Sequence, residues 1–171
     1  MATDLYESSD AEGKPEMLIN PEKFAPFEYR KDHLTVLKMS GTNLLFRDNI
    51  FNFAFCLSSI EHFGSRENQK KALMEIYRIL KSGGILCLAT ELILNNAYHH
   101  EYFTIDELDE VILNATDFKL VGGDIDYRIS SSLVTNPIEL DKKSNLYISP
   151  HIVLKRGDVL WTSIMLFLQK M

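Results

Sequence analysis

The chain has few cysteines, and their placement argues against a protein held together by disulfides or by a cysteine-bound metal. The 171 residues contain two cysteines, Cys56 and Cys87, each inside an apolar run. No CxxC pair and no cysteine/histidine spacing typical of a zinc site accompanies them. We interpret both as reduced core thiols, which excludes a disulfide framework and predicts no metal centre.

Positive charge and extended apolar segments are also scarce. The chain has 18 Lys and Arg residues against 24 Asp and Glu residues, a net charge of −6. That balance argues against broad binding to a nucleic-acid backbone or an anionic membrane. The longest apolar run, near Val159 to Leu168, is too short to span a bilayer, and the acidic first residues do not form a secretory signal. We therefore expect a soluble, cytoplasmic protein whose partners include neither nucleic acid nor membrane.

The composition along the chain predicts one domain after a leader. Residues 1–20 are mostly polar, without periodicity, and are expected to be disordered. Residues 21–171 have enough apolar material for a single α/β domain. Within it, His33 to Gly41 has the content of a short strand that ends at a turn.

The middle of the chain carries a strand, a helix and a second strand in about forty residues. Phe51 to Leu57 is nearly continuously apolar, as in a parallel strand buried on both faces. Ser65 is a candidate cap for an amphipathic helix that Gly83 and Gly84 are expected to stop. Ile85 to Leu92 follows as the second buried strand. The order predicts a βαβ unit, the building block of doubly wound sheets.

The last third predicts a helix, a short strand and a hairpin. Thr104 and Glu107 have capping-box spacing at the start of the helix. The pattern of residues 117–121 predicts a short strand. Residues 130–150 are expected to form a long connecting segment with little regular structure. A turn at Gly157 and Asp158 between two apolar runs predicts an antiparallel hairpin.

Three phrases of the sequence, in this order, resemble the class I S-adenosylmethionine-dependent methyltransferases, in particular their type 11 branch. NLLFRDNIFNFAFCLSSIEHF (43–63) is similar to the passage around that family's fourth strand. KALMEIYRILKSGGILCLATE (71–91) resembles the helix and Gly-Gly turn before its fifth strand, and EYFTIDELDEVILNATDFKLV (101–121) resembles the helix and strand that follow. The resemblance is to the carboxyl-terminal part of the domain and implies a Rossmann-like α/β sheet, mostly parallel with an antiparallel last strand.

The same resemblance implies a site for S-adenosylmethionine at the carboxyl ends of the strands. We assign to it five residues of the turns after two strands: Ser40, Gly41, Asn43, Leu57 and Ser58. The family's glycine-rich loop, which approaches the cofactor, has no counterpart, because the residues before His33 contain one glycine, Gly13. Ser40 and Gly41 also stand where the family usually has an Asp-Ala pair near the adenine. S-adenosylmethionine is thus the cofactor that the resemblance implies, at a site without its main binding motif.

Polar residues after the two central strands are the candidates for chemistry. Glu61 and His62 follow the first of these strands, and a Glu-His pair can position and deprotonate a hydroxyl of an acceptor. Their alternative role is that of polar residues at a helix start. Glu91, His99 and His100 follow the second strand at the same mouth, and we assign the two histidines to substrate binding, with an exposed loop as the alternative.

Three functions remain open. The first is an S-adenosylmethionine-dependent methyltransferase-like protein that acts on a small molecule or a sugar-derived substrate. The second is a non-catalytic methyltransferase-like module for interaction or dimerisation. The third is a Rossmann-like protein that binds some other ligand. Phe51 to Leu57 resembles the family's fourth strand, and in the family the first strand pairs beside it. Without a counterpart of that first strand, an open sheet edge is expected beside Phe51 to Leu57. Either the His33 to Met39 strand pairs at that edge, or a second copy of the chain does, as a homodimer.

Overall fold

The structure, a computed structural model, describes residues 1–7, 14–142, 145 and 152–171. Its internal contacts divide the chain into two units, Met1–Phe46 and Arg47–Met171. The predicted division, a leader over 1–20 and one domain over 21–171, stays a prediction. Residues 8–13 of that leader lie outside the described residues.

The described residues of the first unit form a two-stranded sheet and three short 3-10 helices. Strand β1 pairs parallel with β2, from Ala2 opposite Val36 to Asp4 opposite Lys38. The strand predicted within His33 to Gly41 is confirmed as β2. A strand at the very start of the chain was not expected, because its residues carry no apolar pattern. The elements are β1 (Ala2–Asp4), η1 (Pro15–Leu18), η2 (Pro21–Lys23), η3 (Lys31–His33) and β2 (Val36–Lys38).

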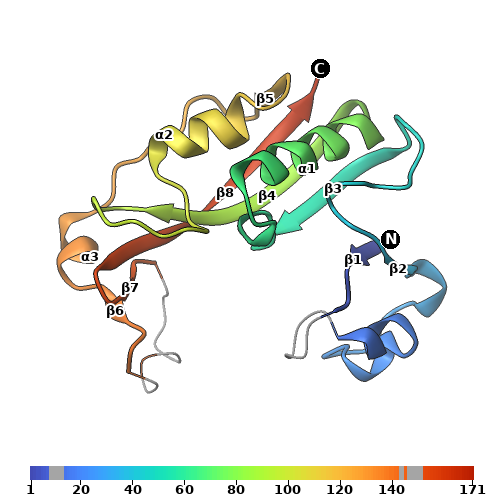
Figure 1. Ribbon diagram of the computed structural model, residues 1–171, viewed down its shortest axis with the longest axis horizontal. Helices are drawn as coiled ribbons and strands as arrows, with labels where there is room; N and C mark the ends of the chain where they lie inside the picture. The colour runs from blue at the N-terminus through green and yellow to red at the C-terminus, as the bar shows by residue number, and fades with distance from the viewer. Residues whose placement is uncertain (8–13, 143–144, 146–151) are drawn as a thin grey trace. The chain divides into compact units, whose positions relative to one another are not determined.

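The second unit contains a six-stranded sheet (Figure 1). Its strands follow the order β3-β4-β8-β7-β6, and β5 pairs with the other end of β8. Neighbours β3 and β4 are parallel, as are β6 and β7, whereas β8 is antiparallel to β4, β5 and β7. All strands of this sheet except β8 therefore run in one direction, which confirms the predicted Rossmann-like class with an antiparallel last strand. The strands are β3 (Phe51–Leu57), β4 (Leu80–Ile93), β5 (Phe118–Leu120), β6 (Ile138–Glu139), β7 (Leu154–Arg156) and β8 (Val159–Lys170).

Helix α1 (Arg66–Ile79) joins the parallel strands β3 and β4, as predicted, but ends before the two glycines. Its Ser65 cap is confirmed, since the hydroxyl accepts the backbone N–H of Asn68. Leu80 is fully buried and already extended, so strand β4 begins there. A Cβ on Gly84 would meet the Lys81 carbonyl at 2.8 Å, so this glycine permits a close backbone approach within β4 instead of ending a helix.

The other predicted elements are present with one change of geometry. Thr104 and Glu107 form the predicted capping box, each side chain accepting the other's backbone N–H. The helix continues from α2 (Ile105–Glu107) into π-helical turns, η5 (Leu108–Leu113). The hairpin of β7 and β8 is confirmed, with Gly157 at φ 54° in the turn. In the described part of residues 130–150, the structure has a short helix, α3 (Ser131–Thr135), and the two-residue strand β6.

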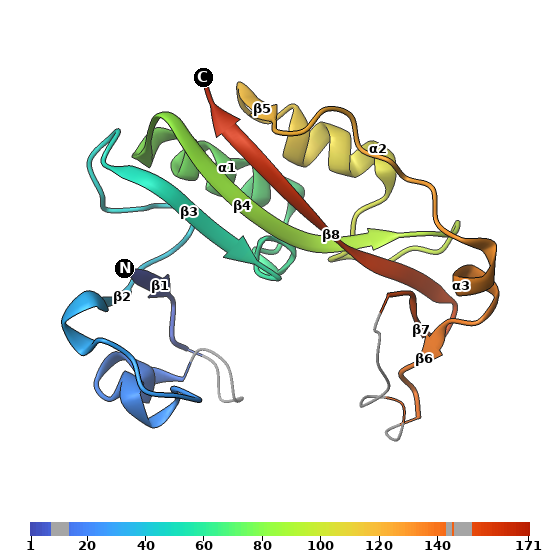
Figure 2. The ribbon, with the colours of Figure 1, turned by 180° about the vertical axis from the view of Figure 1, so that it is seen from behind.

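The core lies between the sheet and the helices on one side of it. Figures 1 and 2 show α1 and α2 on the same side of β4 and β8. Alternate residues of β4 on that side, Leu86, Leu88 and Thr90, are fully buried. None of the helices formed by the described residues has the length and apolar content to cross a bilayer.

Neither α1 nor α2 covers the opposite face of the sheet (Figures 1 and 2). Large apolar side chains at alternate positions of β3 and β8 are exposed there. They are Phe53, Phe55, Leu57, Met165 and Phe167. Strand β2, one of the two partners considered for the edge beside β3, pairs with β1.

Candidate functional site

The loops after β3 and β4 bring polar groups together at one end of the sheet. Because these two strands are parallel neighbours, the segments that follow them lie at the same edge. The 3-10 turn η4 (Ile60–His62) follows β3 and carries Glu61 and His62. Glu91 lies near the end of β4, and Ser163 of β8 stands opposite it. All four residues belong to the second unit.

Glu61 is an internal group, with only 1% of its surface exposed. Its Oε2 accepts a hydrogen bond from the Thr90 hydroxyl at 3.1 Å, and its backbone carbonyl accepts one from Gln69 Nε2 at 3.2 Å. Thr90 and Gln69 are themselves fully buried. Burial, and then the charge of Glu61, raises the pKa of Cys56 to about 12. Glu61 thus ties the turn to β4 and α1 and acts on the site through its charge and its neighbours.

His62 points in a different direction from its sequence neighbour. Its exposed ring places Nδ1 2.8 Å from Oε1 of Glu101. Burial opposes ionisation of Glu101, but the bond to His62 and the charges of His62, His100 and His99 hold its pKa below the usual value. An ionised Glu101 can accept a hydrogen bond from the Nδ1–H of His62, and in that tautomer Nε2 carries the free lone pair of the ring. The predicted Glu-His pair is thus two groups with separate partners.

Glu91 is the carboxyl group whose environment best suits proton transfer. Both of its oxygens lie 3.0 Å from the Ser163 hydroxyl. Burial, and next the charge of Glu61, raises its pKa, while the Ser163 bond and His62 oppose that rise. A carboxyl that keeps its proton to higher pH is a candidate general acid or base. The sequence places Glu91 at this mouth but does not assign it a role.

The loop after β4 stacks its rings on one another. His99 lies 3.8 Å from the Tyr102 ring centre at 20°, and Tyr102 lies 5.2 Å from that of Trp161. Burial and the charge of His100 lower the pKa of His99, which therefore stays neutral more readily. The ring of His100 is 4.9 Å from that of His99 and is exposed. Assignment of both histidines to substrate binding stays a prediction, and the structure places them in the loop that carries Glu101.

Arg66 holds this loop in place, and sequence reasoning missed it. Its guanidinium donates to the carbonyls of Glu101 at 3.1 Å and Tyr102 at 2.6 Å, and lies 4.3 Å from the centre of the Phe103 ring. It also donates to the carboxylate of Glu107 at 3.2 Å. One signal was available, because a basic residue in the first turn of a helix opposes the helix dipole and needs a compensating contact.

The predicted cofactor residues divide between the two units. In the first unit, the Ser40 hydroxyl lies 2.9 Å from that of Thr42, and the Ser40 carbonyl accepts the Asn43 N–H at 3.1 Å. Ser40, Gly41 and Asn43 thus form a turn after β2. In the second unit, Leu57 ends β3 and Ser58 follows at φ 46°, its N–H bonded to the Ala89 carbonyl. The assignment of these residues to a cofactor stays a prediction.

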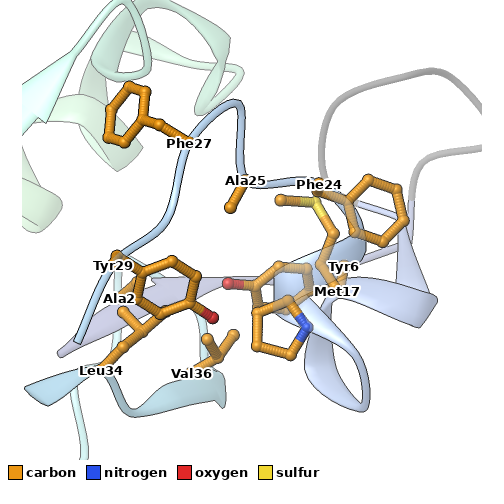
Figure 3. A pocket seen from close by; sticks show the side chains of 10 residues that line it. Ala2, Tyr6, Met17, Phe24, Ala25, Phe27, Tyr29, Leu34 and Val36 are labelled. Atoms are coloured by element: carbon orange, nitrogen blue, oxygen red, sulfur yellow. The ribbon is translucent and has the colours of Figure 1, made fainter. Parts of the chain in front are cut away.

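The first unit also has an apolar cavity of about 250 Å³ (Figure 3). It is lined by side chains from β1, β2 and the segment between them, which Figure 3 shows as a ring of aromatic and aliphatic groups. Phe24, Phe27 and Tyr29 are among them. Tyr6, another lining residue, is 5% exposed, and burial followed by the charge of Asp4 raises its pKa. The cavity therefore has the character of a small core. Its lining residues include none of the carboxyl and imidazole groups found at the ends of β3 and β4, the strand-end cluster of Glu61, His62, Glu91 and Glu101.

Comparison with known proteins identifies the fold. The model of a family described as a methyltransferase domain matches residues 11–88. No curated protein matches the sequence. An S-adenosylmethionine-dependent methyltransferase from Methanosarcina mazei superimposes with a TM-score of 0.55 at 15% identity, over 99% of this chain and 80% of its own. YcgJ from Bacillus subtilis gives 0.55 at 14% identity, over 98% and 80%.

A neighbour with a different activity limits what the fold alone assigns. The 4+2 cyclase SpnF superimposes with a TM-score of 0.53 at 17% identity, over 82% of this chain. This chain spans 57% of the length of that cyclase. The resemblance to class I S-adenosylmethionine-dependent methyltransferases is confirmed, while the reaction has to be argued from the site.

Proposed function

Starting from a chain with the class I methyltransferase fold, we propose that the cluster at the ends of β3 and β4 binds a small molecule and prepares it as a methyl acceptor. The observation that carries the proposal is the convergence of His62, with its Glu101 partner, and Glu91 at the strand ends. In open α/β sheets ligands bind at the carboxyl ends of the strands, where these groups lie.

In this proposal, these residues position the methyl acceptor and remove a proton from it. An acceptor oxygen or nitrogen attacks a methyl group only when its lone pair is free and in line. His62 takes the proton through Nε2, and Glu101 keeps the ring in the tautomer that allows this. Glu91, held by Ser163, donates to or accepts from a second polar group of the substrate. Glu61 stays inside and acts as a positioning residue through Thr90.

The family uses S-adenosylmethionine as methyl donor, and the residues of this chain do not make a complete site for it. Before Gly41 the sequence has one glycine, so no glycine-rich backbone is available to approach the cofactor. The side chain in the usual position of the adenine-binding acid is that of Ser40, and its hydroxyl is engaged with Thr42. The proposal therefore concerns the acceptor side, and no step is assigned to residues that would hold the donor.

Calorimetric titration of the full chain with S-adenosylmethionine and S-adenosylhomocysteine tests the proposal. Because the glycine-rich loop is missing, we expect weak binding, with a dissociation constant of roughly 0.1 to 1 mM. Methyl transfer to a panel of small amines, alcohols and sugars should then be lost in His62→Ala and weakened in Glu101→Gln. Exposed Arg128→Ala, distant in sequence and paired only with Asp126 among the described residues, is the matched control.

Absence of binding at about 5 mM of either ligand would contradict the proposal. It would leave the non-catalytic interaction module as the function to test. Binding that is accompanied by transfer unaffected in His62→Ala would retain the methyltransferase but remove the proton-transfer role of this cluster.

A further inference from the structure

Strand β3 forms an edge of the sheet in the described part of the second unit. It comes first in the strand order and pairs there with β4 alone. Ser58 directs its N–H to the Ala89 carbonyl on β4. Because alternate residues of a strand direct their backbone groups to opposite sides, those of Phe53, Phe55 and Leu57 point to the outer edge. A row of backbone donors and acceptors is thus available for pairing.

This edge lacks the charges and prolines that blunt most sheet edges, and its one irregularity is a register shift against β4 between Phe51 and Phe53. From Asn49 to Ile60 the sequence has no charged residue and no proline. Native edges are normally blunted by lysine, proline or inward charges. The side chains next to the edge are instead apolar and exposed, with 65% of Phe53, 73% of Phe55 and 48% of Leu57 accessible. An uncharged strand of this kind is expected to have a partner.

We infer that the partner is a second copy of this chain, paired antiparallel along β3. The strand is self-complementary: with Ala54 at the two-fold axis, Phe53 lies opposite Phe55 of the partner subunit and Phe55 opposite the partner's Phe53. Both aromatic pairs lie on the sheet face without helices. Aromatic cross-strand pairs stabilise antiparallel strands, and a symmetric contact needs no second type of surface.

The available area fits an association of moderate strength. A large aromatic side chain has about 200 Å² of surface, so the exposed parts of the three side chains amount to roughly 350 Å² per copy. With the backbone edges of two strands, the dimer buries at most about 1,000 Å², the lower end of specific interfaces. A dissociation constant in the micromolar range is therefore expected. The net charge of −6 per copy opposes association elsewhere, but the contact itself carries no charge.

Analytical ultracentrifugation of the full chain between about 1 and 200 µM tests the inference. The wild type should convert from monomer to dimer over this range. Phe55→Lys and Phe53→Lys each place like charges across the two-fold axis and should weaken the dimer at least about tenfold. Both positions are exposed, and circular dichroism checks that each variant is folded.

Phe167→Lys is the matched control. Phe55 on β3 and Phe167 on β8 are the two cross-strand neighbours of the same β4 residue, Cys87. Both side chains are exposed on the same face of the sheet. Only Phe55 lies on the edge strand. A dimer lost in Phe55→Lys and retained in Phe167→Lys supports pairing along β3. A wild type that stays monomeric at about 200 µM, or a dimer weakened equally by both variants, overturns it.

Discussion

Replacing Arg66 by alanine should loosen the loop that carries Glu101 and destabilise the second unit. Three of the bonds made by its guanidinium reach beyond its own helix, to two loop carbonyls and to Glu107. A fourth goes to Gln69. The side chain is 25% exposed, so these bonds are only partly accessible to competing water.

The expected loss is about 3 kcal/mol of unfolding free energy. Hydrogen bonds with a charged partner contribute roughly 1.5 to 3 kcal/mol each, but four bonds from one side chain are not additive. Water replaces part of what is lost at the half-buried carboxylate of Glu107. The carbonyls of Glu101 and Tyr102 account for most of the cost, since they lose the guanidinium that donates to them. A loss of this size lowers the melting temperature by roughly 10 °C.

Urea denaturation followed by tryptophan fluorescence measures the effect, because buried Trp161 contacts Tyr102 in the same loop. Arg66→Lys keeps the charge but not the planar fork of donors, so it should recover less than half of the loss. Arg128→Ala, whose side chain is 90% exposed, should leave the midpoint unchanged. If Arg66→Ala were as stable as the wild type, or Arg66→Lys fully restored stability, the loop would be held by other contacts and the reasoning would be wrong.

Three further predictions follow from single contacts. Leu88→Ala empties a fully buried position and should cost roughly 2 to 5 kcal/mol in urea denaturation, whereas exposed Val121→Ala should change stability little. Thr104→Ala removes a capping box and should cost about 1 kcal/mol in the same assay, and a Thr104→Ser variant should restore most of it. Folding raises the pKa of Glu91 above its usual 4.5. The stability that Glu91 contributes is therefore fully present below pH 4.5 and is lost as the pH rises through the raised, folded-state pKa. Thermal melts from about pH 4 to pH 8 should show Glu91→Gln gaining stability relative to the wild type as pH rises, and a constant difference would contradict this.

The fold could be predicted because its determinants are local in sequence. The apolar run Phe51 to Leu57, the Ser65 cap and the turn at Gly157 each specify an element from adjacent residues, and all three elements are confirmed. The expectation that the strand Phe51 to Leu57 is buried on both faces was wrong, because its alternate side chains from Phe53 to Leu57 are exposed. The end of helix α1 was predicted wrongly for an instructive reason. Gly83 and Gly84 look like a helix stop, but the close approach between Gly84 and the Lys81 carbonyl gives this glycine a role inside a strand.

The sequence predicts where the candidate site lies, but not which side chains contact one another in it. The positions of Glu61 and His62 after β3, and of Glu91 near the end of β4, follow from topology, but their partners do not. Ser163 meets Glu91 only through the register of β8 on β4, and Arg66 reaches the loop 35 residues further along the chain. Even adjacent residues diverge, since Glu61 turns inward to Thr90 while His62 turns outward to Glu101.

The proposed dimer and the strand-end cluster should act independently, because they occupy different positions along the same strands. Phe55 pairs with Cys87, and Glu91 lies four residues further along β4, roughly 13 Å away. Antiparallel pairing also places the two clusters of a dimer at opposite ends of the paired strands.

A double-mutant cycle tests this independence. At such separation the effects of Phe55→Lys and Glu91→Gln on stability should add to within about 0.5 kcal/mol. The pH dependence that Glu91→Gln removes should also be the same in the monomeric Phe55→Lys background as in the wild type. A larger coupling would mean that association reaches the cluster, and the interface would then have to include the loops at the strand ends as well as the β3 edge.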